Sequence, residues 1–219
     1  MTIGYYADPR PDVQGLIRAP NARILDVGCG EGALCAALRA AGASYLAGVE
    51  LEPKAAASAR RVVDALVEGS ILDCALPFSR GEFDYLVFAD VLEHLPDADR
   101  ALERCLPYLA PGGHVVISVP NMRFYLVLLR LIAGRWSYTD SGVRDRTHLR
   151  IFTRHSLQRM LDRHGLRIER LHRNFRLVED QSHIGRAGAL ATRLVRATIA
   201  PALFPDLMAF QYVALARRR

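Results

Sequence analysis

Short apolar runs alternate with segments of helical pattern over the first two thirds of the chain. Such alternation is typical of a parallel sheet covered by helices. Five strands are expected, at residues 22–27, 45–50, 65–68, 83–89 and 114–119. The fourth of these runs is almost entirely apolar, as a buried parallel strand requires. Helices are expected between the strands, at residues 33–41, 53–64 and 97–109.

The last third of the chain departs from this alternation. Residues 121–152 contain no expected strand and are too long for a plain connection. Thr153 has the side chain of a helix N-cap, which predicts a helix that runs to His164 and is closed by Gly165. The remaining expected elements are a turn at 111–113, strands at 166–171 and 210–216, and a helix at 187–199.

Length and composition place the chain among folded globular proteins. Its 219 residues correspond to one domain, and a 51% share of hydrophobic residues excludes a disordered chain. The longest apolar runs fall far short of the ~20 residues that cross a bilayer. Residues 1–12 are polar and carry two aspartates, unlike a signal peptide. We therefore expect a soluble cytoplasmic protein.

The cysteines show no metal-binding pattern. Cys29, Cys35, Cys74 and Cys105 form no Cys-x-x-Cys pair, and no group of cysteine and histidine has zinc spacing. The four thiols are expected to be free and at least partly buried. No bound metal is expected.

Charge is distributed unevenly along the chain. The basic residues are 28 arginines and one lysine, and the net charge is +6. Residues 1–120 carry 10 basic and 16 acidic side chains, whereas residues 121–219 carry 19 basic and 7 acidic ones. A basic C-terminal part can bind an acidic substrate, a phosphate, an anionic membrane or nucleic acid. The alternative is that scattered arginines only solvate helix faces.

A glycine-rich turn after the first expected strand is a candidate binding site. Glycines let the backbone approach a ligand, and the following helix offers unpaired N–H groups. Glu50 ends the second strand, where a carboxylate can accept hydrogen bonds from ribose hydroxyls. The spacing Gly28-x-Gly30-x-x-Ala33 also fits a dinucleotide fingerprint. Asp26 just before the turn instead favours a cationic nucleoside that carries no phosphate.

Around this turn the chain resembles a known family. Residues 24–32, Ile-Leu-Asp-Val-Gly-Cys-Gly-Glu-Gly, resemble the first motif of Rossmann-like S-adenosylmethionine-dependent methyltransferases. Later motifs of that family have similar counterparts, in the expected order, at 48–51, 76–78 with 83–87, 90–95 and 109–113.

The resemblance implies an α/β fold with helices on both faces of a seven-stranded, mostly parallel sheet. The implied strand order is 3-2-1-4-5-7-6, with strand seven antiparallel and a cap-like insertion after strand five. The chain would then be one methyltransferase domain, residues 1–219. Its parts would be a cofactor-binding core at about 22–120, a cap and acceptor segment at about 121–152, and C-terminal elements at 153–219.

The resemblance also implies the cofactor and the residues that hold it. The cofactor is S-adenosyl-L-methionine, which leaves as S-adenosyl-L-homocysteine. Glu50 is implied to bind the ribose diol. We assign Asp73 to the adenine amino group, with Ile71 or Leu72 packing on the ring. Ser70 departs from the family, which often has an acidic residue at this position. The full implied set is Asp26, Gly28, Cys29, Gly30, Glu50, Leu51, Asp73, Ala89 and Asp90.

His94 is the candidate catalytic residue. It follows the fourth strand closely, and imidazole is suited to proton transfer near neutral pH. As a general base it would take a proton from an acceptor hydroxyl. The alternative is a structural histidine that packs the loop, since methyl transfer depends mainly on alignment and exclusion of water.

A narrower resemblance concerns the acceptor. Tyr5-Tyr6 and residues 145–153 resemble a bacterial subgroup found near glycosyltransferase and surface-polysaccharide genes, which implies a role in polysaccharide biosynthesis. Aromatic side chains in a cap can pack on a ring, and arginines can bind phosphate or carboxylate. The alternative is a helix packed on the sheet and then a solvated loop. The candidate acceptor residues are Tyr5, Tyr6, Trp136, Arg146 and His148.

The expected function is methyl transfer to a small-molecule, sugar or glycan acceptor, at oxygen. The acceptor can be anionic or lipid-linked, and residues 187–199 can then rest on an anionic membrane. A plain surface helix or a dimer contact is the alternative for that segment. No nucleic-acid partner is expected. The alternatives left open are a non-catalytic cofactor-binding scaffold in glycan assembly, an RNA methyltransferase and an NAD-dependent oxidoreductase.

Overall fold

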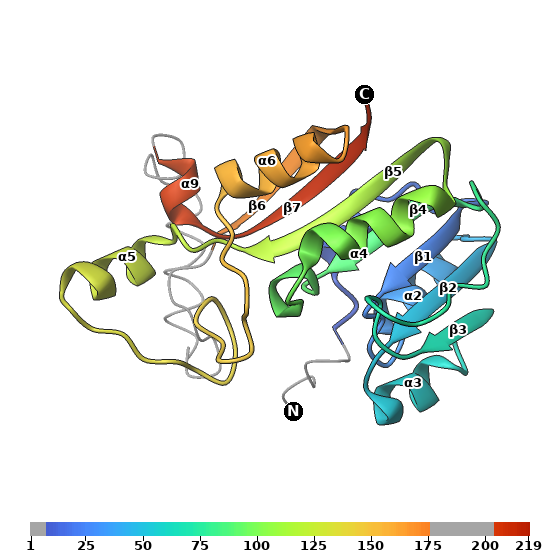
Figure 1. Ribbon diagram of the computed structural model, residues 1–219, viewed down its shortest axis with the longest axis horizontal. Helices are drawn as coiled ribbons and strands as arrows, with labels where there is room; N and C mark the ends of the chain where they lie inside the picture. Colours follow the sequence, from blue (N-terminus) through green and yellow to red (C-terminus); the bar gives the residue numbers. More distant parts are fainter. Residues whose placement is uncertain (1–7, 176–203) are drawn as a thin grey trace.

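A computed structural model describes residues 8–175 and 204–219 (Figure 1). Its centre is a seven-stranded sheet of order β3-β2-β1-β4-β5-β7-β6. Strands β1 to β5 run parallel, and β7 pairs antiparallel with both β5 and β6. The strands are β1 Arg23–Val27, β2 Tyr45–Glu50, β3 Ala65–Glu68, β4 Phe83–Ala89, β5 Leu109–Pro120, β6 Leu166–Phe175 and β7 Ala209–Arg218. The expected fold class, strand order and antiparallel last strand are confirmed.

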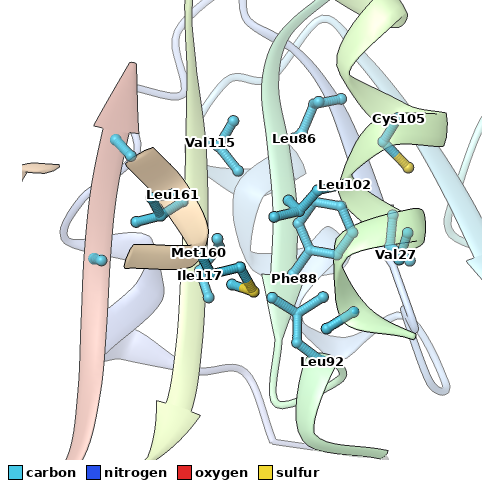
Figure 2. Packing of buried hydrophobic residues seen from close by; sticks show 14 of the residues in the cluster. Val27, Leu86, Phe88, Leu92, Leu102, Cys105, Val115, Ile117, Met160 and Leu161 are labelled. Atoms are coloured by element: carbon cyan, nitrogen blue, oxygen red, sulfur yellow. The ribbon is translucent and has the colours of Figure 1, made fainter. Parts of the chain in front are cut away.

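The strands are apolar on both faces because helices cover both faces. Successive residues of a strand point to opposite sides, so Ile24 and Leu25 of β1 enter two different core clusters. In one cluster, α4 (Ala98–Cys105) and α6 (Arg154–Arg163) pack against β4 and β5 (Figure 2). In the other, α1 (Pro11–Gln14) and α2 (Ala33–Ala40) pack against the opposite face. This double cover explains why β4 is a nearly continuous apolar run.

Two expected elements differ in extent from those observed. The helix expected over 53–64 is α3, Pro53–Ala59, which ends early because the chain must reach β3. Its end tightens into short turns in which Val62 N–H donates to Ala59 O at 2.8 Å. The turn expected at 111–113 instead lies within β5, as an irregularity in its pairing with β4. A Cβ on Gly113 would stand 2.9 Å from Asp84 O, so only glycine permits this close approach.

Other helices and strands differ less from their expected boundaries. The helix expected over 97–109 divides into α4 and the 3₁₀ helix η3, Leu106–Tyr108. β6 and β7 are both longer than expected, because each pairs along most of the other's length. The helix expected at 187–199 lies outside the described residues.

The segment after β5 forms its own small core beyond the end of the sheet. It contains α5, Tyr125–Ile132, and a long loop that returns to α6 (Figure 1). Phe124 and Val127 pack with Val143 of the loop and Phe210 of β7. The short helix α9, Pro205–Met208, directly precedes β7. Among the described helices, none is both long and apolar enough to cross a membrane.

The capping box at the start of α6 gives a test of local stability. Thr153 Oγ1 accepts from Ser156 N–H at 3.2 Å, and Ser156 Oγ accepts from Thr153 N–H at 2.8 Å. We expect Thr153→Ala to lower the free energy of unfolding by about 1 kcal/mol. Thr153→Ser keeps the hydroxyl and is the matched control. Urea unfolding followed by circular dichroism checks both, and equal midpoints for the two variants would contradict the capping role.

Candidate cofactor and acceptor site

A cavity of about 990 Å³ opens at the carboxyl ends of β1, β2 and β4. Open α/β sheets bind ligands at this edge, where loops diverge. One part of its wall comes from the glycine turn and the ends of β2 and β4. The other part comes from the segment after β4 and from the loop between α5 and α6. The second part includes Glu93, His94, Asp140, Asp145, Arg146, Thr147 and His148.

At the glycine turn, backbone atoms without side chains line the cavity. Gly28 and Gly30 have φ of +72° and +56°, and Gly28 N–H donates to Val49 O at 2.7 Å. A Cβ on Gly28 would stand 2.4 Å from Cγ2 of Val91. Both the backbone angle and the close approach therefore require glycine at this position.

Glu50 is held rigidly at the end of β2. Its side chain is buried, and one carboxylate oxygen accepts from Gly30 N–H at 2.8 Å. The other oxygen accepts from Glu52 N–H, also at 2.8 Å. Each oxygen keeps a further lone pair, so the carboxylate can still accept bonds from a vicinal diol. Glu50 is the residue that the family resemblance assigns to the ribose diol.

Asp26 places a second carboxyl group in the cavity wall. It is buried, and its Oδ2 lies 3.5 Å from the Sγ of Cys35. No described group hydrogen-bonds to its Oδ1. Burial raises the pKa of Asp26 from its ordinary value near 3.8 to about 7. A cationic ligand in the cavity would favour the ionised form.

Asp90 is the centre of a hydrogen-bond cluster at the end of β4. Its backbone has φ of +56°, which aspartate tolerates better than most residues. Arg10 donates to its Oδ2 at 2.6 Å, and Ser118 Oγ donates to its Oδ1 at 2.8 Å. Gln211 Nε2 lies 2.7 Å and 2.9 Å from the two oxygens. Three segments far apart in the sequence thus fix the orientation of this carboxylate.

Arg10 is a site residue that sequence reasoning did not identify. Besides Asp90, it binds Asp12 through two bonds of 3.0 Å. Burial opposes ionisation of Asp12, but Arg10 overcomes it and lowers the pKa of that carboxyl. Asn174 bridges Asp12 and Gln211, with 2.7 Å to each. The available signal was the pair of polar residues, Ser118 and Gln211, inside otherwise apolar strands.

His94 lies in the second part of the cavity wall and is tied to the loop after α5. Its Nδ1 lies 3.0 Å from Thr147 Oγ1 and 3.3 Å from Thr147 O. Thr147 Oγ1 in turn donates to Asp145 Oδ1 at 2.6 Å. The ring of His148 packs edge-on against that of His94, with centroids 4.8 Å apart. Burial, with a smaller effect of His94, lowers the pKa of His148.

Glu93 stands next to these imidazoles. Its side chain is only 1% exposed, and no described group hydrogen-bonds to its Oε2. Burial, reinforced by the charge of Asp90, raises the pKa of Glu93. Ligand atoms of Glu93, His94 and His148 all lie within 4.8 Å of one another.

The remaining candidates lie in different places. Of the implied cofactor residues, the cavity wall includes Asp26, Gly28, Cys29, Gly30, Glu50, Leu51, Ala89 and Asp90. Asp73 is not among the lining residues; its side chain is 75% exposed and faces Arg100 at 3.6 Å. Ser70 and Ile71 line the wall on this side instead.

The acceptor candidates are also divided. Arg146 and His148 line the cavity, and Arg146 pairs with Asp140 at 2.6 Å. Trp136 is not a lining residue; it is 40% exposed and contacts the ring of Tyr138 edge-on. Tyr5 and Tyr6 lie outside the described residues.

Comparisons with known proteins agree with this architecture. Residues 4–171 match the family described as "Methyltransferase domain". A ubiquinone biosynthesis O-methyltransferase of Aromatoleum aromaticum is 33% identical over 121 residues, which is 52% of this chain and 50% of the relative. The corresponding protein of Thiobacillus denitrificans is 35% identical over 129 residues, 54% of each chain. The chain spans about half the length of the curated relatives that it matches.

Solved structures show the same fold over nearly the whole chain. An S-adenosylmethionine-dependent methyltransferase from Mesorhizobium loti has a TM-score of 0.64 at 22% identity, covering 95% of this chain and 96% of its own. Magnesium protoporphyrin IX methyltransferase from Synechocystis, solved with bound S-adenosylhomocysteine, has a TM-score of 0.63 at 17% identity, covering 99% and 84%.

The family match confirms the methyltransferase class expected from the five sequence motifs, and the solved structures confirm the fold. They do not place the relatives near glycosyltransferase genes, so that narrower resemblance stays a prediction. With a family match over most of its length and the corresponding sheet order, the chain belongs to the methyltransferase domain family.

Proposed function

We propose that this methyltransferase transfers a methyl group from S-adenosylmethionine to a hydroxyl oxygen of a small-molecule acceptor. The observation that carries the proposal is a single cavity with two chemically different parts. One part has bare backbone and the carboxylates of Asp26 and Glu50, and the other has His94 and the loop after α5. The matched relatives are named as O-methyltransferases, which supports oxygen as the methylated atom.

The residues of the first part fit the cofactor. Gly28 lines the cavity without a side chain, and an added Cβ would collide with Val91. Glu50 presents a fixed carboxylate suited to a ribose diol. The Oδ1 of Asp26, which has no hydrogen-bond partner among the described residues, suits a positively charged ligand. When bound, S-adenosylmethionine supplies a methyl group that its sulfonium has already activated.

The second part supplies what the acceptor needs. Its loop lines the cavity with Asp145, Thr147 and His148, and such lining can reduce the access of water to the reacting atoms. An acceptor hydroxyl has to lose its proton as the methyl group arrives. The imidazole of His94 can accept that proton, because its other nitrogen is held by Thr147.

Two acceptor classes remain within this proposal. A sugar or glycan hydroxyl is favoured by the motif at 145–153, whose Arg146 lines the cavity and can bind an anionic group. A phenolic hydroxyl is favoured by the names of the ubiquinone-biosynthesis relatives. Both need the same cofactor part and differ only in the second part of the cavity.

Calorimetric titration with S-adenosylhomocysteine tests the cofactor site, with NADH as a parallel control. We expect saturable binding of S-adenosylhomocysteine alone. Transfer of labelled methyl groups to sugars, glycolipids and catechols then identifies the acceptor. Saturable binding of NADH alone would overturn the proposal. Cofactor binding without transfer to any acceptor of either class would favour the scaffold alternative.

Substitution of Gly28 tests the placement of the cofactor. Gly28→Val puts a branched side chain where even a Cβ meets Val91, so we expect at least a tenfold loss of S-adenosylhomocysteine affinity. Gly112→Val is the matched control, because Gly112 has φ of +78° and no described atom within 4 Å of an added Cβ. Both variants carry similar backbone strain, about 1–2 kcal/mol. Equal affinities for the two variants in calorimetry would contradict the placement.

The raised pKa of Asp26 gives a test of pH dependence. Since this pKa is about 7 in the folded chain and near 3.8 unfolded, the folded state holds the extra proton between these values. The stability of the wild type should therefore fall, relative to Asp26→Asn, as pH rises from about 4 to 7. We expect the difference in free energy of unfolding between the wild type and Asp26→Asn to change by about 1–3 kcal/mol between pH 5 and 7.

Urea unfolding at the two pH values, without cofactor, measures this change. Asp73→Asn is the control, because Asp73 is largely exposed and its replacement should leave the pH dependence unaltered. Parallel pH curves for the wild type and Asp26→Asn would show that Asp26 ionises normally in the folded chain.

A further inference from the structure

We propose that Glu93, His94 and His148 bind a divalent transition-metal ion at the acceptor end of the cavity. The three side chains come from two separate segments, the turn after β4 and the loop after α5. All three line the cavity that holds the cofactor residues. The role of the ion in methyl transfer rests on the function proposed above, but its binding can be measured independently.

The spacing of the ligand atoms is close to that of a metal site. One ligand atom from each side chain lies within 4.8 Å of the other two. Bonds of about 2.0–2.2 Å to a tetrahedral ion place the ligand atoms about 3.3–3.6 Å apart. Binding of an ion would therefore draw the three side chains about 1 Å closer together.

Hydrogen bonds fix the tautomer of His94 in the form that a metal requires. A carbonyl oxygen only accepts, so the contact of His94 Nδ1 with Thr147 O requires a proton on Nδ1. Thr147 Oγ1 gives its own proton to Asp145 and hence also accepts from Nδ1. The lone pair of His94 is then on Nε2, which is the nitrogen that would coordinate the ion.

His148 is oriented in the same way. Its Nδ1 lies 3.2 Å from Val143 O, which again places the proton on Nδ1 and the lone pair on Nε2. Metal-binding imidazoles commonly donate their second N–H to a carbonyl, hydroxyl or carboxylate. Both histidines of this group have that outer partner before any ion is bound.

Glu93 would supply the carboxylate ligand. Its carboxyl group is almost fully buried, and its Oε2 has no hydrogen-bond partner among the described residues. Its position is fixed, because the backbone oxygen of Glu93 accepts from the N–H groups of Leu149 and Arg150. A buried carboxyl oxygen without a hydrogen-bond partner is unfavourable, and a bound cation would compensate it.

The ligand set determines the class of ion. Two imidazoles and one carboxylate suit Zn²⁺, Mn²⁺, Fe²⁺ or Co²⁺ better than Ca²⁺ or Mg²⁺, which prefer oxygen ligands. Three protein ligands leave a coordination position open, as in catalytic zinc sites. An acceptor hydroxyl bound there would lose its proton more easily. With Nε2 of His94 bound to the ion, that proton would pass to water instead of to His94, while the S–CH₃ bond of the donor breaks and the O–CH₃ bond forms.

The test uses the full chain, freed of metal with a chelator and titrated with Zn²⁺ by calorimetry. Co²⁺ serves as the spectroscopic probe, because its visible absorption reports nitrogen coordination. We expect saturable binding of one ion per chain. His148→Ala and His94→Ala should each weaken it at least tenfold. The matched control is His114→Ala, since His114 lies in β5 and pairs with Glu169 at 3.3 Å, away from the cavity.

The outcomes separate this inference from the proposed function. Loss of binding in the two cluster variants, with wild-type affinity in His114→Ala, supports the site. Absence of saturable Zn²⁺ and Co²⁺ binding, or equal binding by all variants, overturns it. Each variant is also titrated with S-adenosylhomocysteine, which reports correct folding. Cofactor binding without metal binding overturns the metal site alone, and metal binding without cofactor binding overturns the proposed function alone.

Discussion

The site depends on how the carboxylate of Asp90 is held. This group ends β4 in a left-handed backbone conformation and is bound by Arg10, Ser118 and Gln211. Those partners come from the N-terminal segment, β5 and β7, so one carboxylate joins four parts of the chain. Asn174 of β6 extends the cluster through Asp12 and Gln211. Removal of the central charge would leave the buried guanidinium of Arg10 with fewer partners, which is costly.

The fixed end of β4 determines the position of the turn that comes next in the chain. Glu93 and His94 lie in this turn, directly after Asp90, and the backbone of Glu93 binds the loop after α5. Asp145 and Thr147 of that loop reach back to His94. The two parts of the cavity thus meet at β4. The cofactor part is built from strand ends, and the acceptor part is positioned by contacts between a turn and an insertion.

Sequence patterns predicted the features that depend on short segments. The strands between residues 22 and 89 have boundaries close to those expected, because apolar runs and glycine turns are local signals. Glu50 lies in the cavity wall because the end of a parallel strand is a fixed place in this fold. Asp73 does not, since the loop after β3 has no such constraint and turns its side chain to solvent.

Contacts between distant segments could not be predicted from the sequence. Arg10 and Asp90 are 80 residues apart, and His94 and His148 belong to different elements without a recognisable metal spacing. Only the folded chain shows that Thr147 orients His94 or that Glu93 is buried beside the imidazoles. The sequence identified the residue types, but it could not show which of them are neighbours in the folded chain.

The order of the last two strands has a consequence for synthesis on the ribosome. β6 comes before β7 in the sequence but lies outside it at the edge of the sheet, where it pairs with β7. A nascent chain can therefore assemble β1 to β5 before the strand that pairs with β6 has been made. Because Gln211 lies in β7, the Asp90 cluster also waits for that strand. The carboxylate of Asp90 thus acquires its full set of partners only after β7 has emerged, so a nascent chain that stops before β7 lacks the contact with Gln211.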